Sequence, residues 1–530
     1  MNFNRKQIND TFIIFLIIAF IYAVCNFIWW IINTPIIPTW DSAVHFNNIL
    51  EKGYIFYNAP LITWIMKGMF YIFGKEYYDL IVIFVNYVFF LIPLYFIYKI
   101  GTELKDKETG NIAMILFALV PAVYGMSRQY GDQNYHIIAC ITFNIYCLIK
   151  TDYFRNRKWS ICYGISVGLG VLIKDFFIAY FFAPFLYIII SGLTDKFDKI
   201  KIINILFAVT IGILISCRHY FRFSIIEKIL YEPITETVSI FNFESLRITT
   251  IGLWEELLSP PIFIIFVIGL IYFIWKYKGK YKNIILLCFF VPWFIIMLPA
   301  NDKISEYGAG LIPSMILFGA VFLSCIVKKY IKKIILILLI IIGFLQYVDF
   351  SYGSAINLFN MQFKYKNNMI QYYNKNSPLI SYNQKESKLV LNLMKYLKDN
   401  YHYNTFYIEE FCEIDSASIA AQMYLNNMYC IRGNYDTEDV LSSDIIIIIG
   451  KPKTIQKIVQ LKINKMLKNN VNAKMITEEF TSGLINRIVN NFNEIRADYD
   501  IIDIFYVDQN QNNDSKVTLL GKKNKFLHFV

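Results

Sequence analysis

The chain has 530 residues, of which 56% are hydrophobic and 17% are charged, and its mean hydropathy is +0.43. These values lie outside the range of soluble globular proteins and predict that a membrane solvates much of the chain. The net charge of +11 does not favour a nucleic-acid partner, because the basic residues flank apolar runs instead of forming one patch. We therefore expect no nucleic-acid binding.

Apolar segments long enough to span a bilayer, at about 20 residues each, recur through the first two thirds of the chain. The first is too long for a signal-peptide core and is followed by no small-residue cleavage site, which predicts a retained anchor. About eleven transmembrane helices are expected. They lie near residues 11–32, 78–98, 111–127, 133–150, 160–174, 175–192, 202–217, 259–275, 283–300, 308–327 and 334–349.

The short basic clusters fall on one side of a membrane when the chain is threaded through it with a cytoplasmic N-terminus. Short cytoplasmic loops carry an excess of Lys and Arg, so this arrangement predicts the orientation. The clusters are at Lys99–Lys107, Lys150–Lys158, Lys196–Lys201, Lys276–Lys282 and Lys328–Lys333. We expect a plasma (inner) membrane protein whose loops 33–77 and 218–258 lie on the non-cytoplasmic face.

The composition turns polar after about residue 350. Helix-like stretches at 387–400 and 416–426 alternate with strand-like stretches at 404–410, 428–432 and 444–450, a pattern typical of a small α/β domain. We expect a transmembrane domain, 1–350, followed by a soluble extracytoplasmic α/β domain, 351–530. Cys412 and Cys430 both fall in the second domain, and whether they pair is left open.

Charged residues gather in the loops of the predicted external face. They are Asp41 after the first predicted helix, Arg128 and Asp132 after the third, Lys174 and Asp175 between the fifth and sixth, Arg218 and Arg222 after the seventh, and Lys303 after the ninth. Ionisable groups at membrane depth are costly and usually functional, and Arg and Lys facing an external cavity suit a phosphate. Each of them alone is equally compatible with a solvated loop charge, and Lys174 with Asp175 is compatible with a local ion-pair turn.

Four short motifs in this order resemble those of the multi-spanning superfamily of lipid-sugar glycosyltransferases (GT-C type), which includes protein O-mannosyltransferases and the aminoarabinose transferases of lipid A. Trp40-Asp41 is similar to the acidic motif after the first helix, and Tyr57–Gly74 to a Tyr-x-x-Pro-Leu segment ending in Phe-Gly. Tyr163–Lys174 resembles a Gly-x-x-x-Gly-x-x-x-Leu-x-Lys segment. Lys303, Tyr307 and Pro313 resemble a Lys followed by a Tyr and then a Pro at the start of a late helix in the superfamily.

The resemblance covers roughly residues 10–350 and implies an inverting glycosyltransferase. Such an enzyme transfers a sugar from a polyprenyl-phosphate donor to an acceptor hydroxyl on the non-cytoplasmic face. Asp41 would be the base and Asp132 an orienting or secondary carboxylate. The donor would be bound by members of the set Lys303, Arg128, Lys174, Arg218, Arg222, Tyr57 and Tyr307.

One departure from the superfamily concerns the acidic motif. Many members carry two adjacent carboxylates, whereas Ser42 follows Asp41 in this chain. A divalent metal is therefore possible but not implied, and the acceptor remains open among a protein, a lipid and a cell-wall polymer. The alternative functions are a transporter or flippase of lipid-linked sugars and an oligosaccharide polymerase or ligase. The sequence has no internal repeat of the kind that is common in transporters.

Overall fold

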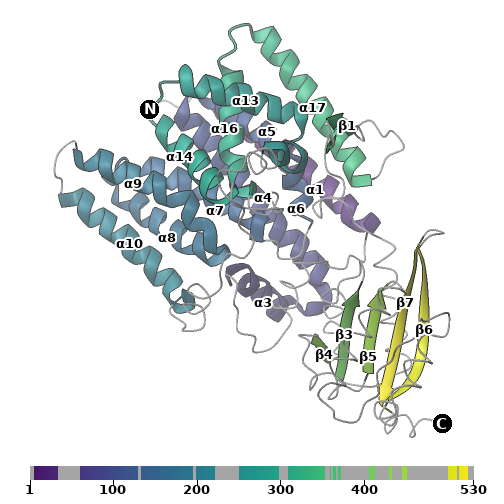
Figure 1. Ribbon diagram of the computed structural model, residues 1–530. Helices are drawn as coiled ribbons and strands as arrows, with labels where there is room; N and C mark the ends of the chain where they lie inside the picture. Colours follow the sequence, from purple (N-terminus) through teal and green to yellow (C-terminus); the bar gives the residue numbers. More distant parts are fainter. Residues whose placement is uncertain are drawn as a thin grey trace. The chain divides into compact units, whose positions relative to one another are not determined.

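A computed structural model of the chain describes residues 5–33, 60–128, 133–194, 199–220, 250–297 and 308–352, together with residue 359 and seven strands between residues 362 and 522. The chain divides into two compact units, 1–34 with 55–382 and 35–54 with 383–530. The described helices all belong to the first unit, and the five-stranded sheet belongs to the second (Figure 1).

The first unit is a bundle of apolar helices. Its α-helices are α1 (Arg5–Asn33), α3 (Leu61–Phe73), α4 (Tyr78–Leu104), α5 (Lys107–Ala118), α6 (Pro121–Met126), α7 (Gln133–Lys150), α8 (Arg157–Ile173), α9 (Ile178–Thr194), α10 (Lys199–Tyr220), α13 (Pro260–Trp275), α14 (Lys282–Pro292), α16 (Ile312–Ser324) and α17 (Lys329–Tyr352). Short 3₁₀ turns cover Lys75–Tyr77, Asp175–Phe177 and Ala309–Leu311, and π-helical turns cover Leu253–Leu258 and Trp293–Met297.

Each of the eleven predicted apolar segments coincides with described helical structure. Within the described residues, four helical segments are long and apolar enough to cross a membrane: Asp10–Ile32, Lys75–Leu104, Lys199–Cys217 and Lys329–Tyr352. Five further apolar helices are shorter. The chain is thus an integral membrane protein, while the number of eleven crossings stays a prediction.

The predicted helix 111–127 is wrong in one respect, because the structure divides it into α5 and α6. The cause is Pro121, which lacks a backbone N–H and disfavours helical geometry in the residue before it. Val120 accordingly has extended dihedral angles, with φ −71° and ψ 120°. The short helix α6 then ends so that Ser127 and Arg128 lie close to α1 and α17.

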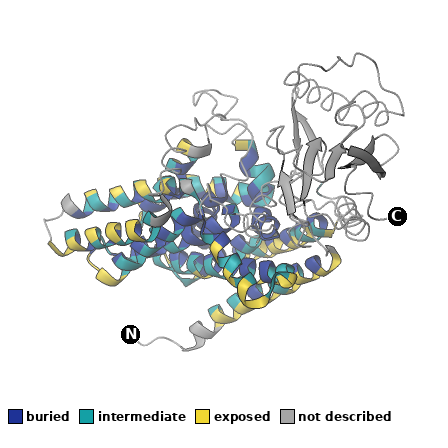
Figure 2. Ribbon diagram, turned by 90° about the horizontal axis from the view of Figure 1, so that it is seen from below, coloured by how far each residue is buried: buried dark blue, intermediate teal, exposed yellow. Residues whose placement is uncertain are grey.

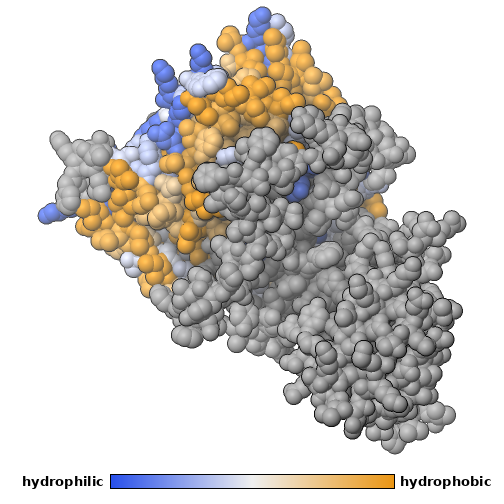
Figure 3. All heavy atoms as spheres, in the orientation of Figure 1, coloured by the Kyte–Doolittle hydropathy of each residue, from blue (hydrophilic) through white to orange (hydrophobic). Residues whose placement is uncertain are grey.

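The helix bundle has a buried centre and an apolar exterior. Buried residues fill the middle of the bundle, and exposed residues lie along its outer helices (Figure 2). The coloured part of the face in Figure 3 is dominated by hydrophobic residues. Phe20 on α1 is 69% exposed and Leu214 on α10 is 65% exposed. Such surfaces are unfavourable in water and are stabilised when lipid covers them.

Glycines of the Tyr163–Lys174 motif let α8 approach α10 closely. A Cβ atom added at Gly164 would lie 2.4 Å from the backbone oxygen of Ala208, and one at Gly168 would lie 2.9 Å from the backbone oxygen of Gly212. Small residues at helix interfaces are the usual means by which membrane helices pack, since no hydrophobic effect drives them together within lipid. The motif therefore has a packing role in this fold.

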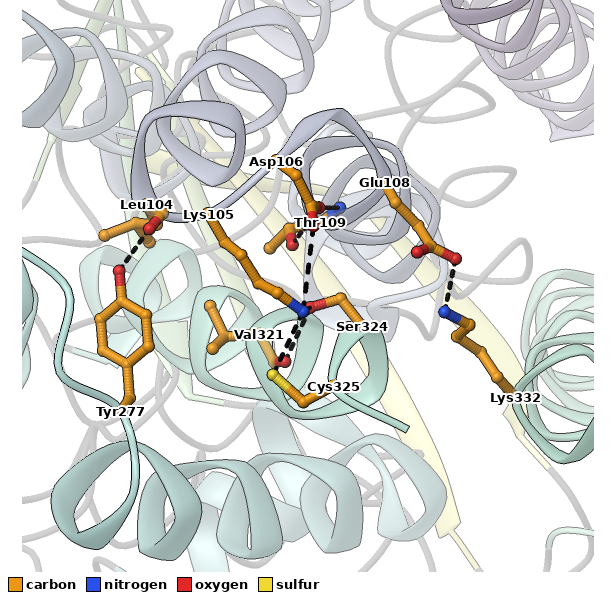
Figure 4. A network of polar contacts seen from close by, with 10 residues as sticks. All are labelled: Leu104, Lys105, Asp106, Glu108, Thr109, Tyr277, Val321, Ser324, Cys325 and Lys332. Atoms are coloured by element: carbon orange, nitrogen blue, oxygen red, sulfur yellow. Dashed lines mark hydrogen bonds and ion pairs between the residues drawn. The ribbon is translucent and has the colours of Figure 1, made fainter. Parts of the chain in front are cut away.

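A network of polar contacts joins helix ends on the predicted cytoplasmic side (Figure 4). Asp106 caps α5 by accepting hydrogen bonds from the backbone nitrogen and the hydroxyl of Thr109, at 2.8 and 2.7 Å. Lys105 donates to Ser324 Oγ at 3.0 Å, which connects the turn after α4 to the end of α16. Glu108 pairs with Lys332 at 2.6 Å and so joins α5 to α17.

The second unit contains a mixed sheet with strand order β4-β3-β5-β7-β6. Its strands are β3 (Thr405–Phe411), β4 (Tyr429–Arg432), β5 (Ile445–Gly450), β6 (Tyr499–Gln509) and β7 (Asn513–Lys522). β3 pairs in parallel with both β4 and β5, and β7 pairs antiparallel with β5 and β6. In the first unit, β1 (Gln362–Tyr365) and β2 (Asn368–Gln371) form an antiparallel pair.

The three strands predicted from the sequence coincide with β3, β4 and β5. Parallel neighbours need long crossover connections, which are helices in most α/β folds. The predicted helices 387–400 and 416–426 lie outside the described residues, as does Cys412. The α/β class of this unit, the boundary at residue 350 and the pairing of the two cysteines therefore remain predictions.

Candidate functional site

The structure describes the side chains of two predicted site residues, Arg128 and Lys174. Arg218 lies on α10, but its side chain is outside the description. The remaining predicted residues lie outside the described part of the chain: Asp41, Tyr57, Asp132, Arg222, Lys303 and Tyr307. The candidate site is therefore built from Arg128, Lys174 and the residues around them.

Arg128 directly follows α6 and is buried, with 4% of its surface exposed. Its Nη2 donates to Ser351 Oγ at 2.7 Å, and its Nε donates to Asn26 Oδ1 at 3.4 Å. These contacts connect the end of α6 to α1 and to α17. Its Nη1 is buried and has no hydrogen-bond partner among the described residues. A buried guanidinium with an unsatisfied nitrogen is costly unless an anion completes its coordination.

Three aromatic rings surround the guanidinium of Arg128. The ring centroids of Trp29, Tyr347 and Tyr124 lie 4.4, 5.2 and 5.5 Å from its central carbon. Each cation–π contact of this kind contributes about 0.5–2 kcal/mol and offsets part of the cost of burying the charge. The rings also restrict how the guanidinium can turn. The arrangement holds one positive charge at a fixed place where α1, α6 and α17 meet.

Lys174 ends α8 in an extended conformation, with φ −153° and ψ 133°. Its Nζ donates to Asn134 Oδ1 and lies 4.8 Å from the centroid of the Phe176 ring. Asn134 is the second residue of α7, so the ammonium group lies at the N-terminal end of that helix. The predicted ion-pair turn with Asp175 is not tested, because the side chain of Asp175 is outside the description.

The two cations lie at opposite ends of one short segment, 129–132. Arg128 immediately precedes this segment, and Asn134, which binds Lys174, comes shortly after it. A chain of this length spans at most about 22 Å between Arg128 and Asn134, even if fully extended. The segment contains Asp132, the predicted secondary carboxylate. Arg128 and Lys174 are thus both attached to residues that adjoin segment 129–132, and the segment itself lies outside the described part of the chain.

Buried polar residues that the sequence analysis did not select support this region. Asn26, Asn86, His136 and Ser351 hold Arg128 and the helix ends on either side of segment 129–132. Asn26 and Asn86 are lone amides within long apolar runs, and polar residues at membrane depth are usually functional. These two asparagines could therefore have been predicted from the sequence.

An apolar pocket of about 310 Å³ lies between α1, α5, α6 and α17. Ile17 on α1 and Ile340 on α17 line it and are 51% and 42% exposed, so the pocket opens at the apolar surface of the helix bundle. Tyr124 and Tyr347 also line it, and these are two of the rings that surround Arg128. The pocket therefore extends from the lipid-facing surface to the aromatic wall in front of a buried cation.

A metal site cannot be assigned within the described residues. No group of three His, Cys, Asp or Glu side chains among them is placed to hold a metal ion. The predicted carboxylates Asp41 and Asp132 lie outside this part of the chain. The involvement of a metal remains a question for experiment.

Comparison with known proteins places the fold. A family model described as dolichyl-phosphate-mannose-protein mannosyltransferase matches residues 57–219, which is less than half of the chain. The structure is similar to that of ArnT from Cupriavidus metallidurans bound to undecaprenyl phosphate, with a TM-score of 0.58 and 9% sequence identity over 97% of this chain and 98% of that one. The apo state of the same protein gives a TM-score of 0.56 at 9% identity, over 94% and 97% of the two chains.

The apo oligosaccharyltransferase from Archaeoglobus fulgidus is similar at a TM-score of 0.50 and 10% identity, over 84% of this chain and 71% of that one. No curated protein sequence matches the chain. At these identities the structural likeness shows the fold alone. Together, the family model and the fold confirm the resemblance to the multi-spanning lipid-sugar glycosyltransferases.

Proposed function

We propose that this protein transfers a sugar from a polyprenyl-phosphate donor to an acceptor hydroxyl on the non-cytoplasmic face of the plasma (inner) membrane. The observation that carries the proposal is the placement of Arg128 and Lys174 at the flanks of segment 129–132, with Arg128 behind the wall of a lipid-facing apolar pocket. Positive charge beside an apolar pocket suits a ligand that has a phosphate at the end of a hydrocarbon chain.

The proposed reaction divides its work between carboxylates and cations. Asp41 takes the proton of the acceptor hydroxyl, and the acceptor oxygen bonds to the anomeric carbon from the side opposite the phosphate. The bond between that carbon and the phosphate oxygen breaks, and its electron pair leaves with the polyprenyl phosphate. Attack from the opposite side inverts the configuration of the sugar. Asp132 orients the reacting groups.

The leaving phosphate gains negative charge as its bond to the sugar breaks. Arg128 offers Nη1, which makes no hydrogen bond within the described part of the chain, and Lys174 offers an ammonium group. Cations that are already in place stabilise this charge without reorganising during the reaction. Arg218, Arg222 and Lys303 are the further candidates for phosphate contacts, and Tyr57 and Tyr307 for contacts with the rest of the donor.

The polyprenyl chain is proposed to occupy the pocket between α1, α5, α6 and α17, which we call the α1–α17 pocket. Its walls are isoleucine, leucine and aromatic side chains, and it opens to the lipid. ArnT, which shares the fold, binds undecaprenyl phosphate, and this supports a lipid phosphate as the ligand of the present chain. The proposal keeps the transmembrane domain at 1–350 and the extracytoplasmic domain at 351–530, and it leaves the sugar and the acceptor to experiment.

Binding of polyprenyl phosphate to the purified protein in nanodiscs, measured by native mass spectrometry, tests the site. Ile340→Trp fills the pocket, whereas Ile337→Trp changes a residue of the same helix that is 45% exposed and does not line it. We expect Ile340→Trp to weaken binding about tenfold and Ile337→Trp to leave it unchanged. Equal binding of polyprenyl phosphate by both variants would show that the polyprenyl chain does not occupy the α1–α17 pocket. No binding to the wild-type protein would count against a polyprenyl-phosphate ligand.

A further inference from the structure

One buried amide, that of Asn86, contacts both sides of segment 129–132. Asn86 lies on α4 and is 2% exposed. Its Nδ2 donates to the backbone oxygen of Ser127 at 2.8 Å, and its Oδ1 lies 2.9 Å from His136 Nε2. Ser127 comes just before the segment and His136 just after it. A single side chain thus holds the end of α6 and the start of α7.

The orientation of the Asn86 amide follows from its partners. The Ser127 carbonyl can only accept a hydrogen bond, so the NH₂ group of the amide must face it. The amide oxygen then faces His136, whose Nε2 must donate the proton. The His136 ring is fully buried and lies edge-on to Phe89, at 4.5 Å between centroids. Both partners therefore require a side chain that donates on one side and accepts on the other.

The backbone of Asn86 extends the same network to α1. Tyr135 donates its hydroxyl proton to the backbone oxygen of Asn86 at 3.0 Å, and the hydroxyl of Tyr22 lies 3.4 Å from that of Tyr135. Asn26, one turn further along α1, donates to Ser127 Oγ at 3.3 Å. Four helices are joined at this point: α1, α4, α6 and α7. An unsatisfied amide within the membrane would be costly, so the geometry is strongly specified.

The network leads directly to the groups of the candidate site. Arg128 directly follows Ser127, and Asn134, which binds Lys174, lies two residues before His136. Holding the end of α6 and the start of α7 together restricts how Arg128 and Lys174 can move relative to each other before any ligand binds. A binding group held in place in this way loses less entropy in the reaction.

We propose that Asn86 is a positioning residue, which fixes Arg128 and Lys174 relative to one another by holding the end of α6 and the start of α7. The reaction in which it positions these groups is the proposed sugar transfer, and the inference rests on that proposal. Asn86 acts through Ser127 and His136 and not by contact with the substrate. A leucine at this place would fill nearly the same volume but would make neither hydrogen bond.

Asn86 and its hydrogen bonds to Ser127 and His136 are called the clamp below. Hydrogen–deuterium exchange tests the clamp without requiring any activity. Asn86→Leu is compared with Asn144→Leu, because Asn144 is also a buried amide, 3% exposed, which donates to Ser166 Oγ at 2.8 Å between α7 and α8. We expect Asn86→Leu to speed amide exchange in a peptide covering residues 127–136 by about tenfold, and Asn144→Leu to leave that peptide unchanged. Unchanged exchange in Asn86→Leu would overturn the clamp.

A variant that removes only one of the two side-chain contacts of Asn86 provides a second test in case Asn86→Leu does not fold. His136→Phe keeps the contact of Asn86 with Ser127 and removes the contact with α7. If Asn86→Leu does not fold, His136→Phe is expected to speed exchange at residues 133–136 more than at residues 124–128. Equal exchange of both stretches at the wild-type rate would overturn the clamp.

Turnover of the lipid-linked donor tests the positioning role. We expect kcat to fall about tenfold in Asn86→Leu and to change by less than about twofold in Asn144→Leu, at similar losses of thermal stability. A wild-type kcat in Asn86→Leu, or equal losses of kcat in both variants, would overturn the role. A wild-type protein that consumes no donor would contradict the proposed function alone, since the exchange measurement decides the clamp independently.

Discussion

Arg128 Nη2 donates a 2.7 Å hydrogen bond to Ser351 Oγ and so joins the end of α6 to the end of α17. In the part of the chain that the structure describes, Nη1 of the same guanidinium has no hydrogen-bond partner. Nη2 thus contributes to helix packing, and Nη1 can donate a hydrogen bond to an anion. This division connects the packing of three helices to the proposed binding of a phosphate.

Arg128→Lys is expected to lower kcat/KM for the lipid-linked donor by about tenfold or more, because an ammonium group cannot replace a planar fork of donors at a fixed place. The measurement is donor consumption at several donor concentrations. Arg157→Gln is the matched control, since Arg157 lies over the Phe207 ring at 4.5 Å, at the predicted cytoplasmic end of α8. An unchanged kcat/KM in Arg128→Lys would remove Arg128 from the phosphate site.

Lys174→Gln is expected to raise KM for the donor by about tenfold while the protein stays folded, because glutamine keeps a hydrogen-bond donor for Asn134 but loses the charge. Thermal stability and KM are measured on the same preparation. Lys280→Gln, a lysine at the other end of the bundle, should leave KM unchanged. If both variants behave alike, Lys174 has only a structural role.

Most of the helices were predictable from the sequence because they coincide with long apolar runs. The break between α5 and α6 was also readable in principle, since Pro121 follows Val120 within one of these runs. The partners of Arg128 were not readable. Ser351 is 223 residues away from it in the chain, and only the packing of α17 against α6 brings the two together.

Of the site residues predicted from charge, the structure describes the side chains of Arg128 and Lys174, and the roles of all of them stay predictions. The sequence predicted Arg128 and Lys174, and the structure places both beside segment 129–132. Asn86 was not among the predicted site residues, because those residues were selected mainly by their charge and Asn86 is neutral. Its two partners are set by helix packing, which hydropathy does not report.

Gly164→Ala is expected to destabilise the protein by about 1–3 kcal/mol, because the added methyl group would lie 2.4 Å from the backbone oxygen of Ala208. Gly192→Ala is the matched control, since its added Cβ would meet nothing closer than 3.5 Å. The midpoint temperature of unfolding, followed by size-exclusion chromatography after heating, is the measurement. Equal midpoints for the two variants would contradict the close packing of α8 on α10.

The ion pair of Asp152 and Lys280 predicts a pH dependence of stability. Lys280 Nζ lies 2.8 Å from Asp152 Oδ1; its hydrogen bond lowers the pKa of Asp152, and the contact raises the pKa of Lys280. The Asp152 contribution is present above about pH 4, the unfolded value, and is lost as pH falls through the lowered pKa. The Lys280 contribution is present below about pH 10 and is lost as pH rises through the raised pKa.

Both side chains of this pair are about half exposed, at 47% and 49%, so the contact contributes at most about 1 kcal/mol. Asp152→Asn should therefore lower the midpoint of unfolding slightly at pH 7 and not at pH 2. The double variant Asp152→Asn/Lys280→Gln should be no less stable than Asp152→Asn alone. A difference from the wild type that persists undiminished at pH 2 would contradict the pair as its cause.

The most direct test of the central claim is donor turnover by the purified protein in nanodiscs. A panel of labelled polyprenyl-phosphate sugars is supplied, with Asp41→Asn as the paired variant, and the release of polyprenyl phosphate and the transfer of sugar to an acceptor are both measured. The account predicts that the wild type converts at least one donor and that Asp41→Asn slows this by about a hundredfold or more. Full turnover in Asp41→Asn would remove Asp41 as the base, and an unconsumed donor that changes leaflet would contradict the transferase in favour of a transporter.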